Sequence, residues 1–139
     1  MADITVTPAN VLDVERVKKA VGVAGEDIDA GCPIYEKIES DGIKRMFLCD
    51  NSGTSEAKVK GVAMTSSASH QPVVYSTDGT IAPGAALTSG MAYFVSNTPG
   101  GICPSTDIAT AGEQISMVGI AVSATDLLLI IKPTGKVIA

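Results

Sequence analysis

Short runs of β-branched and aromatic residues, separated by glycine-rich segments, recur along the chain. Such runs are typical of β-strands, and the segments between them are typical of turns. The pattern predicts strands at residues 33–38, 45–49, 59–65, 73–76, 91–96, 115–123 and 127–132. Residues 127–131 are apolar at every position, so we expect both faces of this strand to be covered, in the centre of a sheet or at a subunit interface. The whole pattern predicts an all-β fold.

The stretch from Asn10 to Gly22 fits two structures. Its valines at positions 11, 14, 17 and 21 have helical spacing, with Asn10 as an N-cap, whereas residues 17–23 also alternate as a strand does. Valine is a poor helix former, so we expect extended structure from Val17 onward. A helical turn before Val17 stays open.

Residues 2–9 have the composition of an exposed arm. The segment formed by Ile4, Thr5, Val6 and Thr7 is β-prone, and Pro8 interrupts it. We therefore divide the chain into an N-terminal arm, residues 1–16, and a single β domain, residues 17–139. A disordered tail, which is common at chain termini, is the alternative for the arm.

The β domain contains an internal duplication, roughly residues 17–81 and 76–137. The segments that begin at Gly25 and Gly84 both read glycine, two residues, apolar, two residues, glycine, three residues, aromatic, 59 positions apart. Residues 42–43 and 101–102 match at the same offset, residues 59–65 match 117–123 at an offset of 58, and residues 73–81 match 129–137 at an offset of 56. Matching blocks in the same order predict two related β-motifs that share one core.

The charges are unevenly distributed along the chain. The net charge is −5, and no Lys or Arg occurs from Gly61 to Ile131. Nucleic-acid affinity depends mainly on cations that neutralise phosphates, and membrane-surface binding depends on polybasic patches, so we expect neither partner. The first residues lack the features of a signal peptide, and the longest apolar run is too short to cross a bilayer. We expect a soluble protein that stays where it is made.

Residues that commonly carry catalysis do not form a recognisable constellation. Cys32, Cys49 and Cys103 include no Cys-x-x-Cys pair, so we expect reduced thiols that pack as small apolar residues. A disulfide or a metal shared between subunits is the alternative. The one histidine, His70, lies in a Ser/Thr-rich segment without a Gly-x-Ser-x-Gly nucleophile motif nearby, so we expect a surface histidine.

The acidic residues Glu26, Asp27 and Asp29 cluster at the first glycine-rich turn. They lack the alternating oxygen ligands and distal glutamate of a calcium loop, and the matching turn of the second motif has no carboxylate. We therefore expect a solvated acidic turn. Glycine motifs that cradle phosphates are also missing. The sequence predicts no metal site, no cofactor and no enzymatic activity.

A series of short segments rich in Gly, Ala and Thr spans nearly the whole chain, at residues 2–11, 23–31, 59–63, 84–90, 93–102 and 117–123. Together, and in this order, they resemble the capsid decoration (cement) proteins of tailed bacteriophages. The charged stretch at residues 13–19 and the acidic first turn depart from that pattern.

The resemblance implies a small β-barrel or β-sandwich of β-clip-like kind. It also implies a virion protein, made in the host cytoplasm, that sits as a homotrimer on the outer surface of the head, binds where major capsid protein subunits meet, and stabilises the shell. The β-prone segment Ile4, Thr5, Val6 and Thr7 is the candidate capsid contact, because an extended segment can add as a strand to an exposed sheet edge.

Two other functions stay open. One is another virion component, such as a head fibre or a tail-associated adhesion module, which a stalk, a repeat array or an aromatic-rich binding face would favour. The other is a small trimeric β-enzyme with active sites between subunits, which a bound metal or nucleotide would favour.

Overall fold

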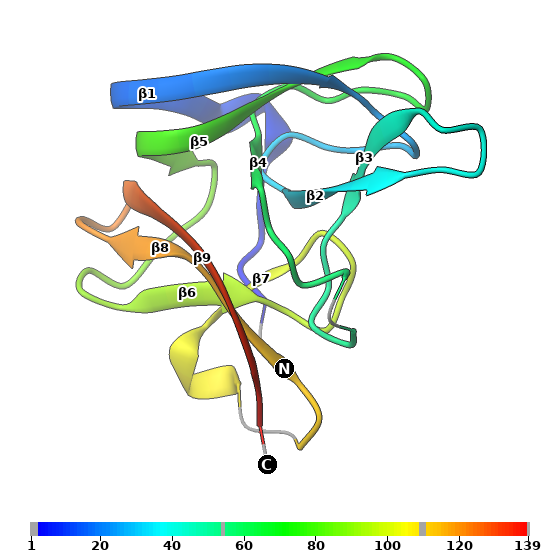
Figure 1. Ribbon diagram of the computed structural model, residues 1–139. Coiled ribbons are helices and arrows are strands. Elements are labelled where there is room, and N and C mark those ends of the chain that lie inside the picture. Colours follow the sequence, from blue (N-terminus) through cyan, green and yellow to red (C-terminus); the bar gives the residue numbers. More distant parts are fainter. Residues whose placement is uncertain (1–2, 54, 109–110, 139) are drawn as a thin grey trace.

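The computed structural model describes residues 3–53, 55–108 and 111–138 (Figure 1). Its strands are β1 (Val11–Val23), β2 (Pro33–Ile38), β3 (Lys44–Leu48), β4 (Gly61–Ala63), β5 (Pro72–Pro83), β6 (Ala92–Val95), β7 (Ile102–Pro104), β8 (Gln114–Ala121) and β9 (Leu127–Val137). Two short 3-10 turns, η1 (Pro8–Asn10) and η2 (Ser105–Asp107), precede β1 and follow β7. None of the helical segments in these ranges has the length or apolar character needed to cross a bilayer.

The strands form one curled antiparallel sheet. Along the path of hydrogen-bonded neighbours the order is β3-β2-β4-β5-β9-β8-β6-β7, and β1 pairs with β5 off this path. In Figure 1, β1, β2, β3 and β5 lie in the upper part of the molecule, and β6, β8 and β9 lie in the lower part. The all-β prediction is confirmed, and the curl fits a small barrel.

Strand β5 joins the upper and lower parts. Its first part pairs with β4, its second part pairs with β9, and β1 runs along its other edge. The β1–β5 ribbon shifts register where Arg16 (φ 53°) and Gly79 (φ 99°) both have left-handed backbones. Gly79 has no room for a side chain, because a Cβ atom there would lie 2.4 Å from Arg16 O. A bulge of this kind bends the ribbon and lets it serve both parts of the sheet.

The two halves of the chain repeat one pairing pattern. In the first half β2 pairs with β3 and β4, β4 pairs with β5, and β5 pairs with β1. In the second half β6 pairs with β7 and β8, β8 pairs with β9, and β9 pairs with β5. Each strand therefore has a counterpart in the other half, and β5 is the last strand of one half and the first of the other.

The glycine-rich turns before β2 and β6 also match. Gly31 N–H donates to Ala63 O, and Gly90 N–H donates to Ala121 O, each at 2.7 Å. Both glycines have a positive φ, 94° and 83°, which residues with a side chain rarely adopt. The similarity of these two sequence segments thus corresponds to a shared backbone structure.

At two places the pairing registers differ from the expected alignment of the halves. Pairing places Ile102 at the position of Met46 rather than of Ile43, because Val95 pairs with a residue seven positions later, whereas its counterpart Glu36 pairs with one ten positions later. It places Leu127 at the position of Tyr75, because the connection from β8 to β9 is shorter than that from β4 to β5. The expected offsets of 59 at residues 101–102 and 56 at residues 129–137 are therefore wrong.

Strand β1 resolves the ambiguity at residues 10–22. It is extended from Val11 to Val23, so the boundary expected between residues 16 and 17 falls inside a strand. A helical turn is present, but η1 lies before the strand rather than within it. The strand form is favoured because β5 provides hydrogen-bonding partners along both parts of β1.

Strand β9 is central, as expected, since it lies between β5 and β8. Its first side chains nevertheless alternate: Leu127 and Leu129 are buried, whereas Leu128 is 38% exposed. The expectation that both faces are covered is therefore wrong within one chain, because the described residues leave this outer face open.

Two clusters of buried side chains support the sheet. The smaller cluster belongs to the first half and includes Ile28, Ile34 and Met46. The larger cluster joins the first half to the second and includes Val62 together with Val118. One face of the first half is thus covered by the second half of the same chain.

Candidate functional site

The N-terminal arm lies against the second half of the sheet. Ile4 N–H donates to Ile102 O at 2.9 Å, and Thr7 N–H donates to Gly84 O at 2.8 Å. In Figure 1 the arm runs as a dark blue trace from near the N-terminus, past β7 and up to β1. It therefore bridges β7 and the residue that follows β5.

In the first half the corresponding gap is closed directly. Gly25 and Met46 are the counterparts of Gly84 and Ile102, and Gly25 N–H donates to Met46 O at 2.8 Å. The arm thus fills, in the second half, a gap that the first half closes by itself.

Alternate side chains of the arm face opposite ways, as in a strand. Ile4 packs against the larger core cluster, and Val6 lies so close to Gly31 that a Cβ atom on this glycine would meet Val6 Cγ1 at 2.4 Å. Thr5 and Thr7 are exposed. The arm is therefore docked on its own chain, and the expectation of an arm exposed along its whole length is wrong.

Specific contacts hold both ends of the arm. At the start, Ser96 Oγ donates to Asp3 Oδ2 at 3.1 Å, and Gly101 leaves room for this carboxylate, since a Cβ atom there would lie 2.4 Å from Asp3 Oδ2. At the other end, Asn10 N–H donates to Thr7 O at 2.9 Å as the chain enters β1. These contacts present the residues between them in one extended conformation.

One backbone edge of the arm faces a hollow. Successive N–H groups of an extended chain point to opposite sides, so Thr5 N–H points away from β7, toward the side of Gly84. A shallow hollow of about 650 Å³ lies on that side. Its lining includes Thr5, Thr7, Ala82, Gly84, Ala85 and Ala86. Such small, uncharged residues allow another backbone to approach closely.

No disulfide joins any two of Cys32, Cys49 and Cys103 within the chain. Burial raises the pKa of Cys32 to about 11 and that of Cys103 to about 12, and it also raises the pKa of Cys49. Because the thiolate is the reactive form, these side chains are poor nucleophiles and poor metal ligands near neutral pH.

The acidic turn serves the backbone. Glu26 accepts a hydrogen bond from Leu48 N–H at 3.1 Å, and Asp27 accepts one from Ser69 N–H at 3.0 Å. His70 is exposed, and its Nδ1 lies 3.1 Å from Ser69 Oγ. Across residues 3–53, 55–108 and 111–138, no three His, Cys, Asp or Glu side chains gather as metal ligands would.

The sequence matches no protein-family model, and no curated protein is significantly similar to it. The structure brings the candidate contact Ile4, Thr5, Val6 and Thr7 together with Gly84 and Ile102, which sequence reasoning did not find. The sequence signal for this contact was the equivalence of Gly84 with Gly25 and of Ile102 with Met46. The first match is visible in the sequence, but the shorter second hairpin hides the second one.

Proposed function

We propose that this protein decorates the outer surface of a tailed-phage head, binds between major capsid protein subunits and stabilises the shell. It reaches the virion after synthesis in the host cytoplasm, acts as a homotrimer and has a structural rather than enzymatic role. The ordered series of segments that resembles decoration proteins supports this proposal. The open edge of the docked arm is the structural observation that carries it.

The arm is suited to strand addition. Thr5 presents its backbone N–H to the hollow, and its side chain is exposed. A segment of the capsid protein in extended conformation pairs with this edge through backbone hydrogen bonds, which require little of its sequence. Three arms in a trimer convert weak individual contacts into durable attachment.

Deletion of the arm is a poor test of this proposal. Ile4 packs against the core and Asp3 accepts a hydrogen bond from Ser96, so removing residues 2–7 also weakens the fold. A variant that changes only the open edge is needed.

Thr5→Pro is such a variant, because it removes Thr5 N–H and retains the N–H groups of Ile4 and Thr7. Thr5→Val is the matched control, since it keeps the N–H and the shape of the side chain. Heads assembled without this protein, from the phage that encodes it, are incubated with each variant and pelleted. We expect Thr5→Val to co-sediment as the wild type does, and Thr5→Pro to bind roughly tenfold or more weakly.

Equal binding by the two variants would remove the arm from the proposal. Failure of the wild-type protein to bind heads would overturn decoration itself. Binding to purified tails or fibres in place of heads would favour the adhesion module.

A further inference from the structure

A second hollow, of about 270 Å³, lies where the end of the β8–β9 pair faces the turn at residues 57–58. The register of the two strands shifts between Ile115 and Ser116, so Thr134 and Gly135 of β9 bulge out of the ladder. A Cβ atom added to Gly135 would meet nothing within 4 Å, so the bulge borders open space. The shape of the bulge is fixed, because Thr134 Oγ1 donates to Ile115 O at 2.6 Å.

Gln114 is a buried polar side chain in the wall of this hollow. It is 7% exposed, and its amide makes no hydrogen bond to any residue that the structure describes. Its amide atoms are not fully enclosed by protein, so the access that they retain is to the hollow. Buried amides in proteins are normally hydrogen-bonded. The unused donors of Gln114 therefore indicate that a further group binds here.

The wall next to Gln114 also has unused hydrogen-bonding capacity. Ser116 lies two residues along β8, on the same face of the strand, and is 1% exposed. Within the described part of the chain its Oγ has no hydrogen-bond partner. Ser116 pairs with Pro133, which lines the hollow. Two neighbouring polar side chains at this end of β8 are thus left without partners among the described residues.

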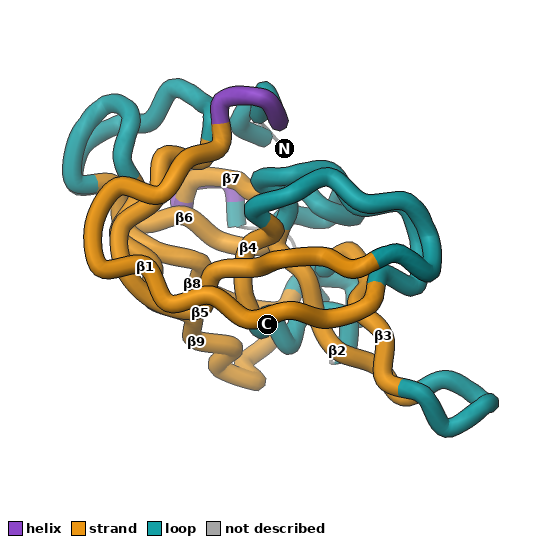
Figure 2. The backbone as a smooth tube through the Cα atoms, turned by 90° about the horizontal axis from the view of Figure 1, so that it is seen from above, coloured by secondary structure: helices purple, strands orange, loops and turns teal. Residues whose placement is uncertain are grey.

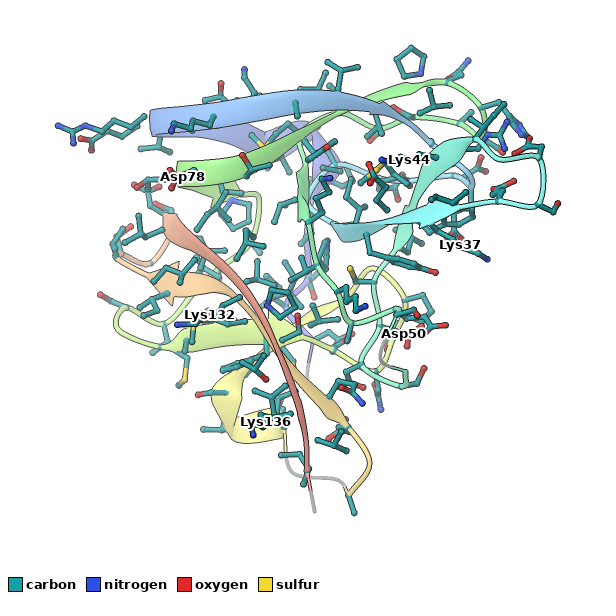
Figure 3. All side chains as sticks on the ribbon, in the orientation of Figure 1. Lys37, Lys44, Asp50, Asp78, Lys132 and Lys136 are labelled. Carbon is teal, nitrogen blue, oxygen red and sulfur yellow. The ribbon has the colours of Figure 1, made fainter. Side chains whose placement is uncertain are left out.

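Lysines supply positive charge at the hollow. Lys58 lines it, is exposed, and takes part in none of the ion pairs between described residues. In Figure 3, Lys132 and Lys136 lie along β9, at the two ends of the bulged segment between them. Neither of these two is paired with a described carboxylate. The charges around the hollow therefore favour an anion.

The carboxylates that are close in sequence do not line the hollow. Glu113, the residue before Gln114, accepts a hydrogen bond from Asn51 Nδ2 at 3.2 Å and lines a different hollow. Glu56 folds back over Gly53, where its carboxylate occupies the space that a Cβ atom would take. The positive charge of Lys58 is thus not neutralised within the hollow.

We propose that this hollow binds a carboxylate carried on a short aliphatic chain. Gln114 donates amide hydrogen bonds to the carboxylate, Lys58 adds a charged donor at the exposed side, and Ile115 and Pro133 contact the aliphatic part. The single cation in the lining matches the single charge of a carboxylate. The hollow shares no lining residue with the one beside the arm, so this site does not depend on the proposed decoration function.

The carboxylate can belong to a free short-chain acid or to the C-terminal residue of a protein. The test is a nuclear magnetic resonance titration of the isotope-labelled full chain with butyrate, with N-acetylvaline and, as the neutral control, with butyramide. We expect saturable shifts of the Gln114 side-chain amide and of the Ile115 and Gly135 backbone amides with a carboxylate, and none with butyramide. Binding of butyrate alone identifies a free acid as the ligand, and binding of N-acetylvaline identifies a C-terminal residue.

Two variants test the proposed donors. Gln114→Met removes the amide and keeps an unbranched side chain, and Lys58→Met removes the charge. We expect each to bind the carboxylate roughly tenfold or more weakly. Lys18→Met is the matched control and should bind as the wild type does, because Lys18 is likewise exposed and outside the ion pairs of the described residues but lies on β1.

The spectra also show whether each variant is folded. Because Lys58 is exposed, Lys58→Met tests the site even if Gln114→Met does not fold. The absence of saturable shifts with both acids, which leaves the hollow to water, overturns the proposal. Equal shifts with butyramide, or wild-type binding by folded Gln114→Met or Lys58→Met, also overturn it.

Discussion

In the first half of the chain, Gly25, which lies two residues after β1, donates its N–H directly to Met46 O of β3. In the second half, the equivalent residues Gly84 and Ile102 are separated, and the N-terminal arm bonds to both. The strands of the two halves pair in the same way, yet the first half makes this contact directly and the second half makes it through the added arm. Two halves with the same pairing pattern can therefore be closed by different contacts.

The outer faces show the same contrast. Ser76 on β5 is buried, whereas Leu128, at the equivalent position of β9, is 38% exposed. The second half carries the hollow beside the arm, whereas exposed apolar side chains of the first half lie along β1, among them Leu12 and Val21.

The largest expected change in the free energy of unfolding comes from a close contact with the neighbouring strand that both halves make. Gly61 and Gly119 are counterparts, and a Cβ atom would lie 2.4 Å from Ser76 O in one case and 2.3 Å from Leu128 O in the other. We expect Gly61→Ala and Gly119→Ala each to lower the free energy of unfolding by about 3 kcal/mol in urea titrations, since neither backbone can move away cheaply.

Gly53→Ala is the control for this pair, because the nearest atoms to its Cβ would belong to the flexible Glu56 side chain. We expect it to cost less than about 1 kcal/mol. A large effect at only one of Gly61 and Gly119 would show that the two halves do not share this contact.

A smaller effect is expected where the halves differ in closure. Ile4 is half-buried against the core, so Ile4→Ala should lower the free energy of unfolding by roughly 1.5 kcal/mol. Thr5→Ala, one residue along and exposed, should change it by less than about 0.5 kcal/mol. Equal effects of the two substitutions in urea unfolding would indicate that the arm is not docked as described.

The smallest effect concerns the hairpin of β2 and β3, which projects from the molecule in Figure 2. The pKa of Asp41 is lowered from its ordinary 3.8, first by a hydrogen bond from Ile43 N–H and then by one from Arg45. The uncharged turn of the second half, at residues 98–101, has no such carboxylate.

A lowered pKa contributes stability above the unfolded-state pKa, and this contribution is lost as the pH falls through the folded-state value. We therefore expect stability to decrease slightly more for wild type than for Asp41→Asn as the pH falls below about 4. Urea unfolding at a series of pH values measures the difference, and parallel pH profiles would contradict it.

The sequence predicted much of this fold because strand and turn signals are local. Pro33–Ile38 is a strand with the expected limits, and the turns at Gly31 and Gly90 follow from glycines that adopt positive φ. Strand β7 was not expected, because three residues that include Pro104 carry little strand signal.

The remaining differences depend on contacts between distant segments. The valines of β1 have helical spacing before Val17 and also alternate as a strand from Val17 onward, and pairing with β5, with a bulge at Arg16, makes the whole segment extended. The candidate contact at residues 4–7 was identified from its β-prone composition. The docking of this segment could not be predicted from the sequence, because the gap that it fills is formed by Gly84 and Ile102, which lie far away in the sequence.

The difference in closure between the halves is tested most directly by hydrogen exchange on the full chain and on a chain that lacks residues 1–7. We predict faster exchange of the amides near Gly84 and in β6 and β7 of the shortened chain, with β3 unchanged. Equal acceleration in β3 and in β7, or no change in either, would contradict the account that the arm closes the second half.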